Sequence, residues 1–320
     1  MLPFLARRLL FGVAVLVLLS LGTCWFFTAH FYQPGSPVPG DPWRTWWGWI
    51  TGLVLHGSVG SSPLGQGLWS AYDPAIVHTA ILLVCAFALV ILVSLVIGTV
   101  SAVRAGSALD VTLRWLAYAT WGMPAFLVGL ILQHVLAIAY GDHGAQPLAL
   151  SHWPGACPIP LTGGFYNGAC KAPGGLAYAL DLVQHLTLPS FALALSFIGI
   201  HARYLRSSLL VTLQAPYTTT ARAKGLPERR VIRHALRNSL IAFASALLLD
   251  FGSIFGASMA VDYVFQLGGI GSAFLGAIAS PTIDPITVTF LIVITGSLVL
   301  LTSIATDVLV SWLDPRVQLR

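Results

Sequence analysis

The amino-acid sequence predicts an all-α polytopic membrane protein with six transmembrane helices. Hydrophobic residues make up 57% of the 320 positions and the mean hydropathy is +0.83, which excludes a soluble domain of ordinary composition. Charged residues are only 8%, and they divide the chain into six apolar intervals. Lysine and arginine collect on one side of these intervals, which predicts the orientation.

Each interval reaches or exceeds the roughly 20 residues with which a helix crosses a bilayer. In chain order the predicted spans lie within residues 8–41, 73–104, 114–142, 181–203, 237–262 and 286–312. The apolar run 9–31 in the first interval is too long for a signal peptide, so we interpret it as a retained span. Asp250 interrupts the fifth interval. An even number of spans places both termini on one side.

Fourteen of the sixteen basic residues fall on the side of the termini, and only Arg44 and Lys171 fall opposite. The fourteen are Arg7, Arg8, Arg104, Arg114, Arg203, Arg206, Arg222, Lys224, Arg229, Arg230, Arg233, Arg237, Arg316 and Arg320. The positive-inside rule therefore predicts a multi-pass protein of the cell inner or plasma membrane with both termini cytoplasmic. The pI of about 9.2 reflects this topology and does not indicate nucleic-acid binding.

Two external segments connect spans one to four. The first contains Trp43, Trp46, Trp47 and Trp49, which favour an interfacial anchor over substrate stacking. The second, residues 141–180, contains Cys157 and Cys170, and the oxidising external compartment predicts that they form a disulfide. The nearby histidines match no standard metal-ligand spacing, so no metal site is predicted.

Residues 207–238 gather most of the charge of the central part of the chain. Two short helices are expected, the first near residues 217–224 and ended by Gly225, which can adopt a positive φ. Pro227 suits the first turn of the second helix, whose apolar and basic residues separate onto two faces. Periodicity alone fits a basic amphipathic helix on anionic lipid equally well.

The detail of this loop resembles a known family. Thr220-Ala221-Arg222-Ala223-Lys224-Gly225-Leu226, followed by Ala235-Leu236-Arg237-Asn238, is similar to the cytoplasmic loop of permease subunits of binding-protein-dependent ATP-binding-cassette (ABC) importers, in the dipeptide, oligopeptide and nickel subfamily. The resemblance implies that residues 220–226 form a coupling helix that docks on an ATPase. Ala242 stands near the place of a usual proline, so a straighter fifth span is expected.

Other segments share the resemblance. They are Gly122-Met123-Pro124-Ala125-Phe126, His185-Leu186-Thr187-Leu188-Pro189, Ala202-Arg203-Tyr204-Leu205-Arg206 and Trp312-Leu313-Asp314-Pro315-Arg316. The family implies a type I ABC importer permease fold. Residues 1–72 would hold the first transmembrane helix and the external Trp-rich segment. Residues 73–316 would form a five-helix transport core with the coupling loop at 207–238. Pro124 predicts a kink, either a moving part or a structural one.

Two acids lie at membrane depth, where a charge is costly and marks a candidate functional site. Asp250 occupies a place where the family has a glutamine-like residue, and Asp262 one where it has glutamate. A structural hydrogen bond and a pathway role remain equally open for both. The candidate pathway or gating residues are Pro124, Asp250, Gly252 and Asp262.

The sequence contains no Gly-rich ATP-binding motif and no hydrolase motif, so the chain is not expected to be an enzyme. The resemblance implies ATP and Mg²⁺ on two separate ATPase subunits, a second homologous permease and an extracytoplasmic binding protein. By family frequency the solute would be a di- or oligopeptide. The alternative is a proton-coupled secondary transporter using Asp250 and Asp262, although such carriers show inverted repeats and none is evident here.

Overall fold

The structure, a computed structural model, describes residues 2–31, 40–58, 60, 67–140, 157–158, 165–166, 176–279 and 283–313. Within these ranges the chain is almost entirely helical, with one antiparallel pair of two-residue strands. The elements are α1 (Leu2–Phe31), α2 (Pro42–His56), α3 (Leu68–Val103), α4 (Ala108–Trp121), α5 (Ala125–Tyr140), β1 (Cys157–Pro158), β2 (Phe165–Tyr166), α6 (Leu176–Leu213), α7 (Pro216–Ala223), α8 (Glu228–Leu249), α9 (Phe251–Phe265), α10 (Ile270–Ala279) and α11 (Pro285–Leu313).

Four helices of the described part, α1, α3, α6 and α11, are long and apolar enough to cross a membrane alone. The pair α4 and α5 and the pair α8 and α9 bring the number to six if each pair is one span. Both pairs are bent, by 99° and 50° respectively. The six predicted spans coincide with these segments, but two of them are not straight.

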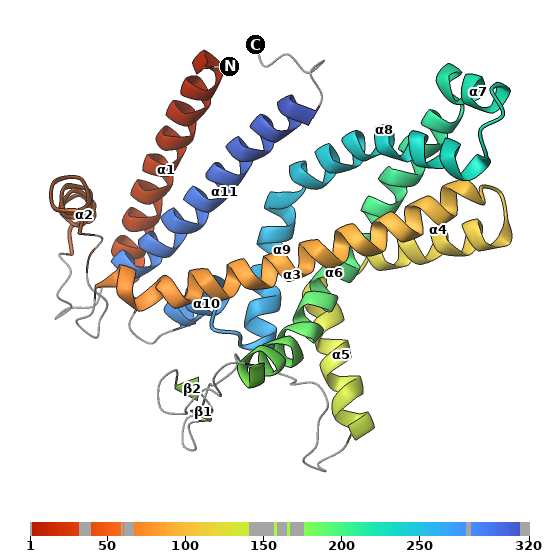
Figure 1. The fold of residues 1–320 in the computed structure, drawn as a ribbon. Coiled ribbons are helices and arrows are strands. Elements are labelled where there is room, and N and C mark those ends of the chain that lie inside the picture. Colours follow the sequence, from red (N-terminus) through yellow and green to blue (C-terminus); the bar gives the residue numbers. More distant parts are fainter. Residues whose placement is uncertain are drawn as a thin grey trace.

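Helix α6 is the centre of the bundle and contacts α3, α4, α5, α8 and α9 (Figure 1). Glycines allow the closest of these approaches. A Cβ atom on Gly199 of α6 would lie 2.2 Å from the carbonyl oxygen of Ala117 in α4. A Cβ atom on Gly98 of α3 would lie 2.8 Å from the carbonyl oxygen of Ala202. Any larger residue at either position would push α3 or α4 away from α6.

The main hydrophobic core lies between α3, α5, α6 and α9. Its fully buried members include Leu82 and Val90 of α3, Leu193 of α6, and Ile254 and Phe265 of α9. Many other large apolar side chains remain exposed, as expected of helices whose outer faces meet lipid.

Helices α1 and α11 pack side by side (Figure 1). Arg8 of α1 forms an ion pair with Asp307 of α11 and donates a hydrogen bond of 2.7 Å to the hydroxyl of Ser303. A Cβ atom on Gly12 would overlap the Leu300 side chain, at 2.3 Å, so the two helices approach closely beside this ion pair. The first turns of α1 and the last turns of α11 therefore lie at the same end of the molecule.

Helix α2 contains the tryptophan cluster that the sequence assigns to the interface. Asp41 caps its first turn by accepting a hydrogen bond of 3.1 Å from the backbone N–H of Trp43. Trp46 donates from Nε1 to the hydroxyl of Ser20 in α1 at 3.0 Å, whereas Trp43 and Trp47 are exposed. One face of α2 is thus fixed to α1, and another is free to meet the membrane surface.

The fifth span and the segment that follows it differ from the sequence prediction. Helix α8 is continuous through Ala242, but the span as a whole bends further along, at Asp250. The hydroxyl of Thr306 in α11 donates to the carbonyl of Leu248 at 3.3 Å, which supplies a partner for a backbone group at this break. The short apolar helix α10, which follows the span, was not predicted at all.

Candidate functional site

The residues predicted to couple to an ATPase lie on α7 and the turn after it, at one end of the molecule (Figure 1). Pro216 occupies the first turn of α7, and the helix ends at Ala223, followed by Lys224 and by Gly225, whose φ is 76°. The backbone N–H of Leu226 donates to the carbonyl of Ala221 at 3.2 Å and closes the turn. The predicted positive φ at Gly225 is confirmed.

Two contacts attach α7 to the helices beside it. Thr218 is fully buried, and its hydroxyl lies 2.6 Å from the carbonyl of Ala215 and 3.0 Å from that of Leu213, the last residue of α6. The ring of Tyr217 packs edge-to-face against His234 of α8, with 5.6 Å between the ring centres. The orientation of α7 is therefore set by both α6 and α8.

Arg222, in the predicted coupling segment, is held by partners within the chain. Its guanidinium makes two hydrogen bonds to the carboxylate of Glu228, at 2.7 Å and 3.1 Å, and a third of 3.3 Å to the carbonyl of Leu213. The hydrogen bonds with Glu228 raise the pKa of Arg222 above its usual value. Sequence reasoning missed this pair, although Glu228 is the only acid in the basic stretch and so was its available partner.

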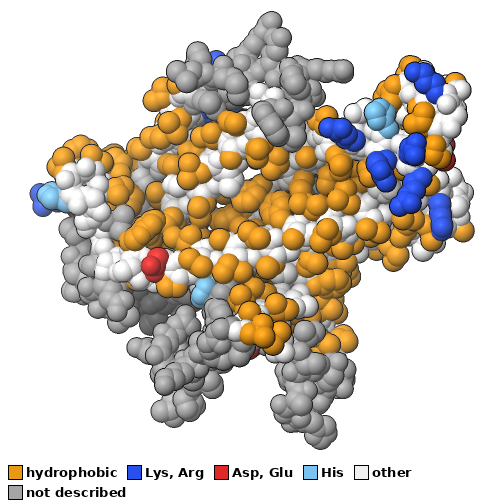
Figure 2. Space-filling model, in the orientation of Figure 1, with side chains coloured by type: hydrophobic (Ala, Val, Ile, Leu, Met, Phe, Trp, Pro, Cys, Tyr) orange, Lys and Arg blue, Asp and Glu red, His pale blue; other side chains and the backbone are white. Residues whose placement is uncertain are grey.

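The rest of the predicted coupling segment is accessible. Ala221 is half-buried, and Thr220, Ala223, Lys224, Gly225 and Leu226 are exposed. Figure 2 shows lysine and arginine side chains gathered at this end of the molecule, whereas hydrophobic side chains cover its middle. The exposed basic residues beyond α7 are Arg229, Arg230, Arg233 and Arg237 on α8.

The bend between α4 and α5 confirms the kink predicted at Pro124. The bend leaves the carbonyl of Met123 outside the helical hydrogen-bond ladder, because the N–H of Leu127 bonds to Pro124 instead. The hydroxyl of Ser196 in α6 donates to this carbonyl at 3.0 Å. A side chain from the central helix therefore stabilises the bent backbone.

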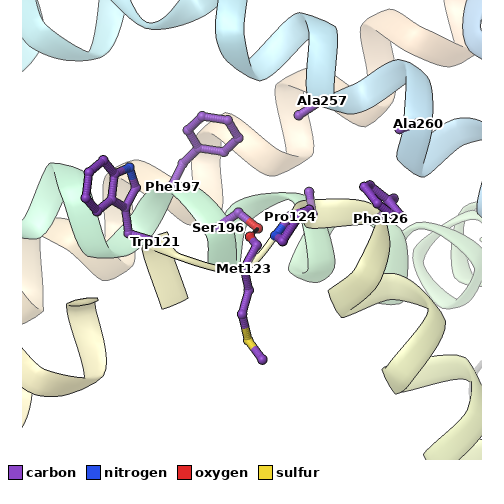
Figure 3. Close-up of a pocket in the computed structure, with 9 residues that line it drawn as sticks. Trp121, Met123, Pro124, Phe126, Ser196, Phe197, Ala257 and Ala260 are labelled. Atoms are coloured by element: carbon purple, nitrogen blue, oxygen red, sulfur yellow. Dashed lines mark hydrogen bonds between the residues drawn. The ribbon is translucent and has the colours of Figure 1, made fainter. Parts of the chain in front are cut away.

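A cavity of about 280 Å³ lies at this bend. Figure 3 shows Ala257 and Ala260 of α9 across from Pro124 and Phe126. Its remaining lining residues are Trp121, Met123, Ala125, Ser196 and Phe197. The wall contains no charged side chain among the described residues. Of the candidate pathway residues, Pro124 is the one that this cavity includes.

Asp250 and Gly252 lie at the break between α8 and α9. The carboxylate of Asp250 approaches Nε2 of His201 in α6 at 3.4 Å, and its side chain keeps 33% exposure while the histidine is fully buried. Gly252 is exposed, and a Cβ atom there would meet nothing within 4 Å. These residues are not in the cavity at Pro124.

Asp262 is buried near the end of α9 and organises the connection to α10. Its carboxylate accepts hydrogen bonds from the backbone N–H groups of Gly269 at 2.9 Å and Ser272 at 2.6 Å. The hydroxyl of Thr79 in α3 accepts from the N–H of Ile270 at 2.9 Å. A Cβ atom on Gly269 would lie within 3 Å of both Asp262 and Thr79. This geometry is that of a structural cap.

A second charged cluster was not anticipated as a unit. Asp110 of α4 is fully buried, and Arg206 of α6 donates to both of its oxygens at 2.8 Å. The hydroxyl of Ser101 in α3 donates at 2.5 Å. Three helices are therefore joined through one carboxylate. Arg206 stood in a segment that resembled the family, but 96 residues separate it from Asp110 in the chain.

The disulfide predicted between Cys157 and Cys170 falls outside what the structure describes, since Cys170 and the side chain of Cys157 are not included. Cys24 and Cys85 are free thiols within α1 and α3. No group of three or more potential metal ligands occurs in the described ranges.

Comparison with known proteins agrees with this architecture. Residues 94–319 match the family described as binding-protein-dependent transport system inner membrane component. The chain is 29% identical over 341 residues to the oligopeptide transport system permease protein OppB of Escherichia coli (strain K12), covering 99% of this chain and 100% of that protein.

Two further relatives are also permease proteins of peptide transport systems. The dipeptide transport system permease protein DppB of Escherichia coli (strain K12) is 26% identical over 362 residues, covering 99% of each chain. The oligopeptide transport system permease protein AppB of Bacillus subtilis (strain 168) is 28% identical over 276 residues, covering 84% of this chain and 78% of the relative. The family match extends from α3 to the end of α11, so the chain belongs to the binding-protein-dependent transport system inner membrane components, as a permease subunit of an ABC importer.

Proposed function

We propose that this permease subunit imports di- or oligopeptides. In the working complex it pairs with a second, homologous permease subunit, rests on two ATPase subunits that bind ATP and Mg²⁺, and receives solute from an extracytoplasmic binding protein. The names of its relatives, which are dipeptide and oligopeptide permease proteins, support the solute class. The distribution of basic residues supports cytoplasmic termini and a cytoplasmic α7.

The observation that carries the proposal is the geometry of α7. It is a short, accessible helix at the end of the bundle, and buried Thr218 and the Tyr217 ring attach it to α6 and α8. Small residues at Ala221, Ala223 and Gly225 allow another protein surface to approach its backbone closely. A helix that is exposed yet firmly attached can transmit the movement of a docked partner to the spans.

The cavity at Pro124 supports a solute path through the bundle. Its wall is apolar apart from the hydroxyl of Ser196, which is already bonded to the Met123 carbonyl. Such a wall offers no fixed charge that would favour one peptide side chain over another. Solute selection is then left largely to the binding protein, which suits a transporter of varied peptides.

In this mechanism ATP binding draws the two ATPase subunits together, and each coupling helix moves with its ATPase. The spans change between inward-facing and outward-facing arrangements around the path. At the bends at Pro124 and Asp250 the backbone hydrogen bonds of the helix are interrupted, so the two halves of each span can change their angle there with the least loss of hydrogen bonding.

The alternative of a proton-coupled carrier receives little support from the two acids. The carboxylate of Asp262 is occupied by backbone N–H groups of the turn before α10 and of α10 itself. Asp250 faces a histidine at the break between α8 and α9, away from the cavity at Pro124. No line of ionisable side chains connects the two acids in the described part.

The test is reconstitution of the complete complex with its binding protein, followed by measurement of peptide uptake and peptide-stimulated ATP hydrolysis. Gly225→Val should uncouple peptide uptake from ATP hydrolysis, because a β-branched residue resists a φ of 76° and would tilt α7. Ala223→Asp should weaken docking through added bulk. Arg230→Ala, on the exposed face of α8, is the matched control and should change little.

Co-purification of the ATPase subunits separates lost assembly from lost coupling. Normal uptake and normal ATPase retention in the Gly225→Val complex would mean that α7 is a lipid-facing amphipathic segment. A coupled complex that no di- or oligopeptide stimulates would instead remove the proposed solute and leave the coupling role intact.

A further inference from the structure

Three arginines line one recess where α4 and α6 pack together, and two of them, Arg114 and Arg206, lie within 4 Å of the carboxylate of Asp110. Arg206 occupies both oxygens of Asp110, and Ser101 donates to one of them as well. Arg114 is the second arginine, and its Nε lies 3.7 Å from Asp110, which is too far for a hydrogen bond. That nitrogen is buried and has no hydrogen-bond acceptor among the described residues.

Arg203, the third arginine, lies about one turn before Arg206 on α6. Its guanidinium stacks over the rings of Tyr118 and Trp121, with 4.5 Å and 5.4 Å to the ring centres. Its Nη1 is buried without an acceptor, and no carboxylate of the described part lies within the 4 Å of an ion pair. The rings fix the position of the guanidinium but supply no negative charge to balance it.

The cluster therefore contains three positive groups and one negative group. Asp110 is hydrogen-bonded to Arg206, and Arg114 shares the same carboxylate at 3.7 Å with its side chain 42% exposed. Arg203 has no ion-pair partner among the described residues. Partly buried cations of this kind are costly unless an anion accompanies them. Within the described chain no second anion is available to do so.

The surroundings indicate where the missing anion comes from. The three arginines line a shallow recess whose other walls are Ile97, Ser101, Leu113, Ala117 and Ala202. The two rings under Arg203 are also accessible, since Tyr118 is 51% exposed and Trp121 is 53% exposed. Exposed aromatic side chains next to arginines at the end of a span are typical of the boundary between the bilayer and water.

We propose that Arg114 and Arg203 bind the headgroup phosphate of an anionic phospholipid, whose acyl chains lie along Tyr118 and Trp121. A guanidinium matches the oxygens of a phosphate in a bidentate manner, and basic pockets between transmembrane helices bind acidic headgroups in this way. A free phosphate ion would satisfy the charges but leave the neighbouring apolar side chains uncovered. The lipid satisfies both.

The arginines of α8 provide the contrast. Arg229 and Arg233 are exposed to solvent, so water and counter-ions already surround their charges. They bear the same charge on the same molecule without the recess, the ring stacking or the exposed tryptophan. The pair Arg229→Gln and Arg233→Gln is thus a matched control for Arg114→Gln and Arg203→Gln.

The experiment uses the full-length chain in mild detergent containing equimolar phosphatidylglycerol and phosphatidylcholine, with retained lipid counted by native mass spectrometry. The wild-type chain should retain phosphatidylglycerol in preference to phosphatidylcholine. The Arg114→Gln, Arg203→Gln variant should lose about tenfold or more of that retention, because each basic group near a membrane surface contributes to binding anionic lipid. The α8 control variant should retain it.

Two results would overturn the proposal. The first is an equal loss of phosphatidylglycerol in the two double variants, and the second is displacement of phosphatidylglycerol by inorganic phosphate, which would identify a free anion. Arg114→Lys with Arg203→Lys, which keeps both charges, guards against misfolding and should hold more phosphatidylglycerol than the glutamine variant.

Discussion

Two arginine–carboxylate pairs with nearly the same local geometry occupy opposite environments. In one, Arg206 donates twice to Asp110 at 2.8 Å, with the carboxylate fully buried and the two residues 96 positions apart. In the other, Arg222 donates twice to Glu228 at 2.7 Å and 3.1 Å, with both side chains exposed and only six positions apart.

The difference shows that hydrogen-bond distance alone does not measure how much an ion pair contributes to the stability of the fold. Water and salt screen the exposed pair, so breaking it changes little. The buried carboxylate also accepts from Ser101 and joins α3, α4 and α6, so losing it leaves donors on more than one helix unsatisfied. The first pair holds three helices of the bundle together, whereas the second links the end of α7 to the start of α8 across an accessible turn.

The largest expected effect is that of Asp110→Asn. It removes the charge that neutralises Arg206 and should lower the free energy of unfolding by roughly 2–3 kcal/mol, somewhat below the cost for a completely buried pair because Arg206 is 20% exposed. Thermal unfolding of the detergent-solubilised chain measures it. The double variant Asp110→Asn, Arg206→Gln should recover part of the loss, and a purely additive result would contradict the coupling described above.

An intermediate effect is expected at Asp250, which keeps 33% exposure and faces the buried ring of His201. Asp250→Asn retains a polar group and should preserve folding and most of the uptake. Asp250→Leu should destabilise the chain by about 1–2 kcal/mol, because the imidazole loses its polar neighbour in an apolar setting. The same unfolding measurement, combined with uptake, distinguishes these outcomes. If the asparagine variant folded normally but abolished uptake, the charge itself would be required for transport.

The smallest effect is expected for Glu228→Gln. Both members of this pair are exposed, so the unfolding midpoint should stay unchanged at low and at high salt. The α8 variant Arg230→Gln is the matched control. A shift of the Glu228→Gln midpoint approaching that of Asp110→Asn would mean that the exposed pair fixes α7 in place.

The same contrast explains what could be read from the sequence. Features encoded in a short segment were predicted, such as the apolar spans, the turn at Gly225 and the existence of a kink at Pro124. The size of that kink was not, because it depends on Ser196 reaching the Met123 carbonyl from another helix. The pair Asp110 and Arg206 was missed for a similar reason, since its partners meet only after folding.

The acids at membrane depth teach a related lesson. Depth alone left a structural role and a pathway role equally open for Asp262. Its backbone partners depend on Gly269, where a side chain would collide with Thr79 of a third helix. Helix α10 was overlooked because its ten residues are too few to count as a span.

Helix α6 has a mechanical consequence. Its end, Leu213, supplies a carbonyl to both Thr218 and Arg222 of α7, and its residue Ser196 bonds to the bend at Pro124. The helix is uninterrupted over the 17 residue steps from Ser196 to Leu213, which is roughly 25 Å. Helix α6 therefore acts as a stiff rod between α7 and the cavity. A displacement of α7 along that rod arrives at Pro124 without passing through any loop.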